Sequence, residues 1–358
     1  MTQTAESGSG AAAAPAPAAS HGFHGVQYVL HRLWCSLLGR MDIAADDDFF
    51  AIGGTDESAR ELCRRIADNL GCDVAFETFR SAPTFEALSV LVRTSSSGTR
   101  EGPLLRLQRG AEADRGAIYC FHPISGSPVR YAAMVDYVDP VQPVYGVQAI
   151  GLLPGHEPDR SIEAMADRYS RAILRHASNR AAVLLGYSSG GVVAFEAARR
   201  LEDSALDVTL GIVDSCPVDE LDADVAFGYA SVIKTIFRLD LDMAELMSQG
   251  EHERLETIRT AASQAGKLPA TFALDRLQRI IDVCNANAAA TAAYRPEPWQ
   301  GRATVFESDD GRALTCAADW SRYINDVTTR PLAGDHETVV EGESLAAIAH
   351  WAQSALIA

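Results

Sequence analysis

A serine flanked by glycines is the clearest chemical signal in the chain. The sequence GYSSGG at 186–191 follows the apolar run AAVLL at 181–185 and precedes a helix-like segment that begins at Val192. A Gly-x-Ser-x-Gly pattern between a strand and a helix forms a turn that is too tight for larger flanking residues and exposes the serine hydroxyl above the sheet. A Gly/Ser loop can match this pattern by chance, but the neighbouring strand and helix favour Ser188 as a nucleophile.

A serine hydroxyl is a weak nucleophile, so it needs a base and a carboxylate that orients the base. Asp214 directly follows the next apolar run, at 208–213, and would lie beside the serine if both runs are neighbouring strands. His336 lies in the loop sequence GDH, shortly before the last helix-like segment. Serine, acid and histidine in this chain order form one of the recurring catalytic triads.

Other residues compete for the acid and base roles. Asp203 and Asp207 precede the apolar run rather than follow it, which makes them weaker candidates for the acid. His350 falls inside the last helix-like segment and is predicted to be structural. His122 follows an apolar run and is therefore the nearer rival of His336.

Acyl transfer also needs hydrogen-bond donors for the negative oxygen of the tetrahedral intermediate. One donor is expected from the backbone N–H of Ser189, the residue after the nucleophile. The other is expected from an early strand–helix loop, and HPISGS at 122–127 follows the apolar run at 117–121. Within this loop the backbone N–H of Ile124 is the predicted donor.

Short apolar runs alternate with helix-like segments from residue 104 onwards. Such an alternation predicts an α/β domain in which helices cover both faces of a parallel sheet. The runs lie at 117–121, 144–147, 181–185, 208–213 and 303–306, with helix-like segments at 161–176 and 192–201 between them.

The segment at about 217–298 is longer than a simple crossover needs and has a mostly helical pattern. We predict a helical lid over the active site, because a cap after the acid-bearing strand can exclude water. Most of its apolar residues must also pack against one another. They are Phe227, Tyr229, Ile233, Ile236, Phe237, Leu246, Phe272, Leu277, Ile280 and Ile281.

The chain before residue 104 has a different character. Residues 1–24 are rich in Ala, Pro, Ser and Gly and are predicted to be a flexible leader. Residues 25–93 contain three amphipathic patterns, of which the last has Thr84 as its predicted N-cap and Leu91 or Val92 facing inward. Residues 94–103 are predicted to be a linker because Ser, Gly and Thr dominate them.

Charge and cysteine usage limit the possible partners and compartments. The 31 Lys and Arg against 48 Asp and Glu give a net charge of −17, which argues against binding to nucleic acid. No uninterrupted apolar run reaches the roughly 18 residues of a membrane span. The seven cysteines are scattered without a CxxC pair, and the N-terminus lacks the features of a signal peptide. A cytoplasmic protein with free thiols and no metal site is the simplest interpretation.

Residues 104–358 resemble the thioesterase domain that ends nonribosomal peptide synthetases. The resemblance rests on FHPISG at 121–126, GYSSGG at 186–191, VDS at 213–215 and GDH at 334–336. It implies an α/β-hydrolase fold with a helical lid. It further implies that Ser188 accepts a peptidyl chain from a carrier's phosphopantetheine thioester, with upstream synthetase modules as partners, and that water or a nucleophile within the chain releases it.

On this resemblance, the catalytic residues receive separate roles. His336 is implied to be the general base and later the general acid. Asp214 is implied to orient His336 and to stabilise its imidazolium form.

Residues 25–93 resemble a peptidyl carrier domain, a small four-helix bundle, through the sequence DDDFFAIGG at 46–54. The family then has one residue followed by the serine that carries 4′-phosphopantetheine. Here Asp56 fills that slot, and a carboxylate cannot form the phosphodiester, although Asp suits a helix N-cap. Ser58 lies about 200° further around a helix and is a poor substitute. The domain is either a naturally silent carrier or one in which Asp56 was introduced.

The combined features predict a chain-releasing serine thioesterase, by macrocyclisation or by hydrolysis. A free-standing esterase or proofreading thioesterase is a second hypothesis, which the fused carrier-like domain argues against. A third hypothesis is a docking module with an inactive hydrolase fold. It predicts a broken triad, whereas Ser188, Asp214 and His336 are all present.

Overall fold

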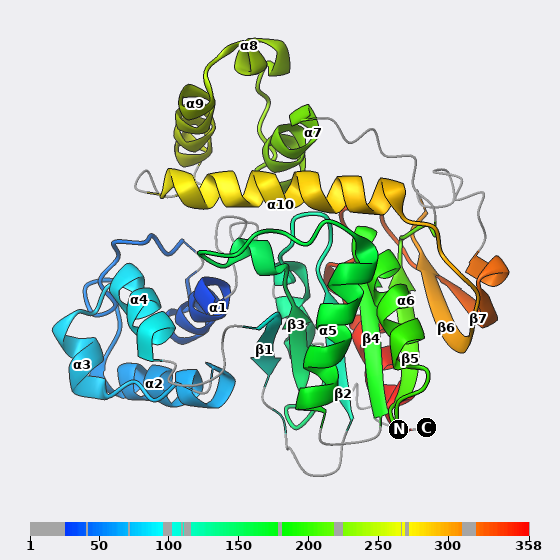
Figure 1. Ribbon diagram of the computed structural model, residues 1–358. Helices are drawn as coiled ribbons and strands as arrows, with labels where there is room; N and C mark the ends of the chain where they lie inside the picture. Colours follow the sequence, from blue (N-terminus) through cyan, green and yellow to red (C-terminus); the bar gives the residue numbers. More distant parts are fainter. Residues whose placement is uncertain are drawn as a thin grey trace, which may run out of the picture.

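The computed structural model describes two domains, a small helical one and a larger α/β one (Figure 1). The residues described are 26–40, 42–70, 72–95, 102–108, 110, 116–177, 181–217, 225–265, 267–268, 272–309 and 320–357. The predicted leader at 1–24 and most of the predicted linker at 94–103 lie outside these residues.

The small domain contains four helices around an aromatic core, as the carrier resemblance implied. They are α1 (Val26–Leu38), α2 (Asp56–Leu70), α3 (Phe76–Ser81) and α4 (Phe85–Ser95). The indole of Trp34 is fully buried and meets the rings of Phe49, Phe79 and Phe85 edge-on. Edge-to-face packing of this kind adds to the stability gained from burial alone.

Two details of this domain refine the sequence pattern. The hydroxyl of Thr84 accepts a hydrogen bond from Ala87 N–H at 3.2 Å, so Thr84 caps α4 as predicted. Val92 is fully buried, whereas Leu91 is only partly buried, so Val92 is the inward-facing residue of that pair.

The α/β domain is built on a seven-stranded sheet in the order β1-β3-β2-β4-β5-β6-β7. The strands are β1 (Leu104–Gln108), β2 (Ala117–Phe121), β3 (Val144–Val147), β4 (Ala181–Tyr187), β5 (Asp207–Val213), β6 (Trp299–Glu307) and β7 (Ile324–Pro331). Six strands run parallel, but β1 pairs antiparallel with β3. The prediction of a parallel sheet was therefore wrong at its edge, because the strand starting at residue 104 had not been recognised.

Helices cover both faces of the sheet, which the alternating pattern had predicted (Figure 1). One face packs against α5 (Ile162–His176) and α6 (Ser189–Leu201), and the other against α11 (Gly342–Ala355) and the short helix η1 (Val129–Asp136). Side chains alternate between the faces along β2. Tyr119 and Phe121 belong to the core between the sheet and helices α5 and α6. Ile118 and Cys120 belong to the core between the sheet and α11 with η1.

A helical lid follows β5, in the segment where the sequence predicted one. Its elements are α7 (Val225–Ala230), η3 (Ser231–Ile236), α8 (Met243–Ser248), α9 (Glu251–Gln264) and α10 (Leu274–Ala293). In Figure 1, α10 crosses the top of the α/β domain, and α7, α8 and α9 lie above it. The lid has a hydrophobic core of its own, which includes Ile233, Phe237, Leu277 and Ile281.

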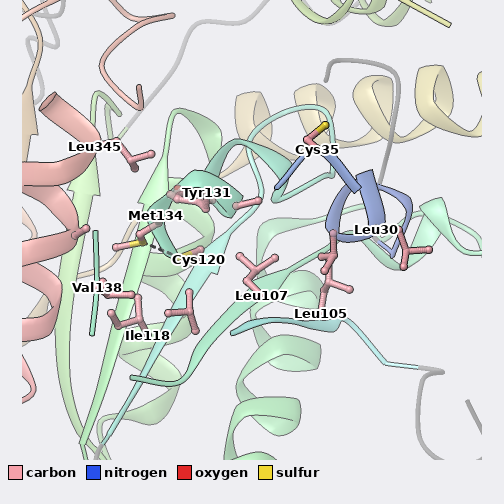
Figure 2. Packing of buried hydrophobic residues seen from close by; sticks show 14 of the residues in the cluster. Leu30, Cys35, Leu105, Leu107, Ile118, Cys120, Tyr131, Met134, Val138 and Leu345 are labelled. Carbon is pink, nitrogen blue, oxygen red and sulfur yellow. Dashed lines mark hydrogen bonds between the residues drawn. The ribbon is translucent and has the colours of Figure 1, made fainter. Parts of the chain in front are cut away.

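The small domain packs against the β1 edge of the α/β domain rather than standing apart from it. One hydrophobic cluster runs from Leu30 of α1 through Leu105 and Leu107 of β1 into the α/β core (Figure 2). Polar contacts flank this cluster. Arg32 binds the Ala132 carbonyl and the Asp136 carboxylate, and Arg276 of the lid donates to Gln27 Oε1 at 2.6 Å.

The cysteines depart from the sequence interpretation. Cys35, Cys63, Cys72, Cys120 and Cys284 are buried thiols outside any disulfide, but Cys216 is disulfide-bonded. Spacing in the sequence does not reveal which thiols meet in space, and this is why the expectation that all are free was wrong.

The cytoplasmic location stays a prediction. Among the helices that the structure describes, none is long and apolar enough to cross a membrane.

Candidate active site

Ser188 occupies the turn between β4 and α6 in a conformation that L-residues rarely adopt. Its φ is 55° and its ψ is −136°. Its backbone N–H donates to the Val213 carbonyl at 2.9 Å, which fixes the turn against β5. Such strain persists only where the surrounding structure imposes it, and it often marks functional sites.

Glycine is required beside Ser188 by close backbone contacts. A Cβ atom on Gly186 would lie 2.2 Å from the Gly190 carbonyl oxygen. A Cβ on Gly190 would lie 2.6 Å from the carbonyl oxygen of His122, in the loop after β2. Both clashes are with backbone, which cannot move aside as the end of a flexible side chain can. The glycines of GYSSGG therefore bring the serine turn close to the loop after β2.

Ser188, His336 and Asp214 form a continuous hydrogen-bonded chain. Nε2 of His336 lies 3.1 Å from the Ser188 hydroxyl oxygen, and Nδ1 of His336 lies 2.9 Å from Oδ2 of Asp214. These are the distances at which a base can take the serine proton while a carboxylate orients the ring. Ser188 and His336 are 148 positions apart in the sequence, and Asp214 and His336 are 122 positions apart. The fold thus brings together three residues that are distant in the sequence.

Asp214 is held by a residue that the sequence interpretation missed. Ser308 follows β6 and donates to Asp214 through its backbone N–H, at 2.8 Å, and its hydroxyl, at 2.7 Å. Burial alone would raise the pKa of Asp214, but the hydrogen bonds from His336 and Ser308 outweigh burial and lower the pKa below its usual value. The sequence did contain one signal for Ser308. It directly follows an apolar strand, as Asp214 does, and the carboxyl ends of neighbouring parallel strands lie at the same end of the sheet.

The loop that carries His336 is fixed from two sides. The Tyr187 hydroxyl donates to the His336 carbonyl at 2.6 Å, and the two rings lie 5.0 Å apart between centroids. Arg130 donates to the Glu337 carbonyl at 2.8 Å and also pairs with the Glu337 carboxylate. These contacts hold the imidazole over the serine.

Of the two residues whose backbone N–H groups were predicted as oxyanion donors, Ile124 lines the cavity beside Ser188 and Ser189 is its direct neighbour in the sequence. Ile124 and Ser188 line one small cavity of about 90 Å³, and Ser189 begins α6 directly after the serine. Within the described part of the chain, neither Ile124 N–H nor Ser189 N–H donates a hydrogen bond. Both donors are therefore available to a ligand.

The cavity beside Ser188 also has walls from the lid and from the Arg130 region. Thr235 and Ile236 of η3 close it from the lid side. The lining is mostly apolar, and the remaining residues are Pro123, Ser125, Ser127, Val129, Arg130, Tyr187, His336 and Glu337. No residue of the small domain lines this cavity among those described.

The rival acid and base candidates lie elsewhere. Asp203 and Asp207 are exposed, and Asp207 pairs with Arg302 at 3.1 Å. His350 is exposed on α11. His122 is buried, and this burial lowers its pKa to about 4, so the ring is neutral near pH 7.

Asp56 is the first helical residue of α2, and its carboxylate pairs with Arg80. The prediction of Asp56 as an N-cap was wrong, because Thr55 caps the helix instead. Ser58 N–H donates to the Thr55 hydroxyl at 3.2 Å, and Thr55 N–H donates to the Ser58 hydroxyl at 2.8 Å. The hydroxyl of Ser58, the serine nearest the slot, is thus hydrogen-bonded at the start of α2.

Among the described residues, no group of three or more His, Cys, Asp or Glu is arranged to hold a metal ion. The serine chain and the two predicted backbone donors provide a nucleophile, a base and hydrogen-bond donors for an oxyanion. Such a constellation supports nucleophilic acyl transfer.

The fold is that of an α/β-hydrolase with a helical lid. The chain belongs to the thioesterase domain family, whose model matches residues 117–354. A second family model, described as a phosphopantetheine attachment site, matches residues 29–92. The resemblance to a carrier domain followed by a thioesterase domain is confirmed, and the family implies hydrolase activity.

The relatives of this chain include a protein named as a probable non-canonical nonribosomal peptide synthetase, from Salinispora arenicola, at 27% identity over 330 residues, covering 89% of this chain and 4% of that protein. The chain is 27% identical over 305 residues to malpinin synthetase of Mortierella alpina, covering 84% of this chain but 4% of that protein. It is 29% identical over 178 residues to surfactin synthase subunit 3 of Bacillus subtilis, covering 50% of this chain and 13% of that protein. The chain thus spans a small fraction of the curated relatives that it matches.

Solved structures support the fold of both domains. A four-domain nonribosomal peptide synthetase bound to AMP and glycine matches 96% of this chain and 26% of its own, with a TM-score of 0.73 at 22% identity. The Vlm2 thioesterase domain matches 69% of this chain and 95% of its own, with a TM-score of 0.51 at 22% identity. The α/β-hydrolase fold with a preceding helical carrier-type domain is therefore confirmed.

Proposed function

We propose that this protein releases a peptidyl chain from a carrier-bound thioester through an acyl-enzyme on Ser188. The observation that carries this proposal is the hydrogen-bonded chain from Ser188 through His336 to Asp214, with distances of 3.1 and 2.9 Å. The family match supports the reaction class, and the relative named as a nonribosomal peptide synthetase supports a peptidyl substrate.

In the first half-reaction, His336 accepts the Ser188 proton as the hydroxyl attacks the thioester carbonyl. The backbone N–H groups of Ile124 and Ser189 stabilise the oxygen that becomes negative. The tetrahedral intermediate then collapses, the thiolate of the carrier arm leaves, and His336 supplies the proton that makes it a thiol. Asp214 remains ionised and stabilises the imidazolium throughout.

In the second half-reaction, a nucleophile attacks the Ser188 ester with His336 as base. Water gives a free acid, and an amine or hydroxyl within the peptidyl chain gives a macrocycle. Both outcomes use the same residues, so the choice depends on which nucleophile reaches the ester. A lid that contributes Thr235 and Ile236 to the cavity restricts water and thereby favours the internal nucleophile.

We further infer that the acyl group comes from a carrier other than residues 25–93. The slot that the resemblance assigns to phosphopantetheine holds Asp56, which pairs with Arg80, and Ser58 is engaged by Thr55. The small domain packs against β1 through its own hydrophobic contacts and does not line the Ser188 cavity among the described residues. It would then serve as a fixed docking element.

Turnover of synthetic peptidyl thioesters tests the proposal. We expect wild-type protein to consume the thioester and the folded Ser188→Ala variant to show no turnover above background. Mass analysis of the product separates a free acid from a cycle, which is lighter by one water. Undiminished turnover by Ser188→Ala would refute the proposal.

A further inference from the structure

The peptide that joins Pro123 and Ile124 is fixed through its carbonyl group. The Pro123 oxygen accepts a hydrogen bond from Nδ1 of His122 at 2.9 Å and another from Gly126 N–H at 2.9 Å. A carbonyl oxygen has two lone pairs, so this acceptor is saturated. Because a trans peptide is planar, a fixed carbonyl also fixes the opposite N–H, which belongs to Ile124.

The next peptide is fixed from the lid. Nδ2 of Asn287 in α10 donates to the Ile124 carbonyl at 2.9 Å, and Asn287 is only 3% exposed. The two peptides on either side of the Ile124 Cα are therefore held independently, one from the α/β core and one from α10. Rotation about the two Ile124 backbone bonds would break one of these contacts.

The group that this arrangement orients is the Ile124 N–H. We propose that His122 and Asn287 are positioning residues, which together aim the Ile124 N–H at the carbonyl oxygen of the acyl group on Ser188. The inference rests on the proposed function, since it assigns Ile124 to the oxyanion hole. Neither side chain touches the substrate in this account.

His122 can act in this way only in one tautomer. A carbonyl oxygen only accepts hydrogen bonds, so Nδ1 must carry the proton that points to Pro123. Nε2 of the neutral ring then accepts from the Tyr169 hydroxyl, 2.8 Å away. Tyr169 is fully buried and thus selects the tautomer that binds the Pro123 carbonyl.

Helix α10 also approaches the same loop directly. A Cβ atom built on Gly126 would lie 2.4 Å from the Val283 side chain of α10. Gly126 has a φ of +76°, so the turn that leads away from Ile124 needs glycine for conformation as well as for space. The lid helix therefore forms part of the framework around the oxyanion donor.

Two mild variants test the proposal from opposite sides. Asn287→Ala removes the donor to the Ile124 carbonyl, and Tyr169→Phe removes the hydroxyl that selects the His122 tautomer. Since the Ile124 N–H itself stays in the chain, we expect kcat to fall about tenfold, short of the roughly 100- to 1,000-fold loss for a missing donor. We expect KM to change by less than about twofold, because the donor acts mainly on the transition state.

Thr291→Val is the matched control. Thr291 lies one turn beyond Asn287 on α10, is 2% exposed, and donates its hydroxyl to the Asn287 carbonyl at 2.8 Å. The variant removes a buried hydroxyl from the same helix but leaves the contact with Ile124. We expect its kcat to equal that of the wild type.

Affinity for a trifluoromethyl ketone is a measurement that does not change when a variant is merely less stable but still folded. This inhibitor forms a tetrahedral adduct with a nucleophilic serine and places an oxyanion at the donors. We expect its affinity to fall by the same factor as kcat in both variants, while the affinity for a non-reactive thioether analogue of the substrate stays constant. Folded variants with wild-type kcat and wild-type ketone affinity would overturn the proposal.

Failure of this inference differs from failure of the proposed function. If the function is wrong, wild-type turnover will not depend on Ser188. If only the inference is wrong, turnover will depend on Ser188 but will be unaffected by Asn287→Ala and Tyr169→Phe.

Discussion

Ser308 donates two hydrogen bonds to Asp214, from its backbone N–H to Oδ1 at 2.8 Å and from its hydroxyl to Oδ2 at 2.7 Å. The same Oδ2 accepts from His336 at 2.9 Å. Ser308 is fully buried, and the Asp214 side chain is 2% exposed, so water does not compete for these contacts. Ser308 therefore supports the carboxylate that orients the base.

Ser308→Ala should lower activity without abolishing it. The variant loses the hydroxyl bond to Asp214 but keeps the backbone bond, and a hydrogen bond to a charged group contributes about 1.5–3 kcal/mol. We expect the lower end of that range, because the backbone hydrogen bond from residue 308 to Asp214 remains. A loss of this size lowers kcat for a synthetic thioester about tenfold. Steady-state kinetics with a folded variant measures this effect.

Ser215→Ala is the control for this comparison. The Ser215 hydroxyl is buried beside Asp214, and it forms no hydrogen bond with the residues described. Its removal should leave kcat near the wild-type value. Equal effects of the Ser308 and Ser215 substitutions would contradict the role assigned to Ser308.

The buried His122 should make the folded state sensitive to mild acid. Burial lowers its pKa to about 4 from 6.5, with small opposing effects from the Pro123 carbonyl and Asp159. The unfolded chain therefore binds more protons between these values, so the free energy of unfolding falls as pH drops from about 6.5 to about 4. Below pH 4 both states are protonated and this contribution levels off.

Thermal unfolding of the wild type and of His122→Gln across pH 4 to 7 measures this contribution. We expect the variant to lose less stability than the wild type over that range. His252→Gln, at an exposed histidine of the lid, provides the comparison and should keep the wild-type slope. Parallel curves for the wild type and His122→Gln would rule out His122 as the source.

The contact between the two domains should be detectable by calorimetry. Arg32 of α1 donates to the Ala132 carbonyl and pairs with Asp136, both in the α/β domain. We expect Arg32→Ala to lower the melting temperature of the small domain by a few degrees, because a contact of about 1 kcal/mol has that effect on a domain of this size. The melting of the α/β domain should stay in place.

Arg40→Ala serves as the matched substitution. Arg40 also pairs with an aspartate, Asp42 at 2.8 Å, but this partner lies in the small domain itself. Because the Asp42 side chain is 80% exposed, this pair contributes little, and we expect Arg40→Ala to keep the wild-type melting profile. A wild-type profile for Arg32→Ala as well would mean that the Arg32 contact does not stabilise the small domain against the α/β domain.

The nature of residue 56 should decide whether the small domain can be loaded. We expect no mass gain when the wild type is incubated with a phosphopantetheinyl transferase and coenzyme A, because Asp56 has no hydroxyl. Asp56→Ser restores an acceptor at the start of α2 and should gain the arm. A phosphopantetheine adduct on the wild type would show that another residue serves as the attachment site.

The sequence predicted the parts of the site that depend on local pattern. The GYSSGG turn, the position of Asp214 after a strand and the GDH loop each have a short-range signature, and the structure joins their side chains at hydrogen-bond distance. The lid was predicted from its length, and Thr84 from capping chemistry. Each of these features except the lid is encoded within a few neighbouring residues.

The missed features depend on contacts between distant segments. Ser308 meets Asp214 across 94 positions, and Asn287 meets the Ile124 carbonyl across 163. The antiparallel strand β1 and the disulfide of Cys216 were missed for the same reason, since pairing partners cannot be read from spacing. The N-cap of α2 was predicted one position too late, at Asp56, because Thr55 caps the helix through its hydrogen bonds with Ser58.

Covalent labelling of Ser188 tests the account most directly. Wild-type protein is treated with a fluorophosphonate and digested, and the modified peptide is identified by mass spectrometry. We expect one adduct, on Ser188, no adduct in Ser188→Ala, and labelling at least about 100-fold slower in His336→Ala, which lacks the base. A wild-type protein that remains unlabelled while folded, or an adduct on another serine, would contradict the assignment of Ser188 as the nucleophile.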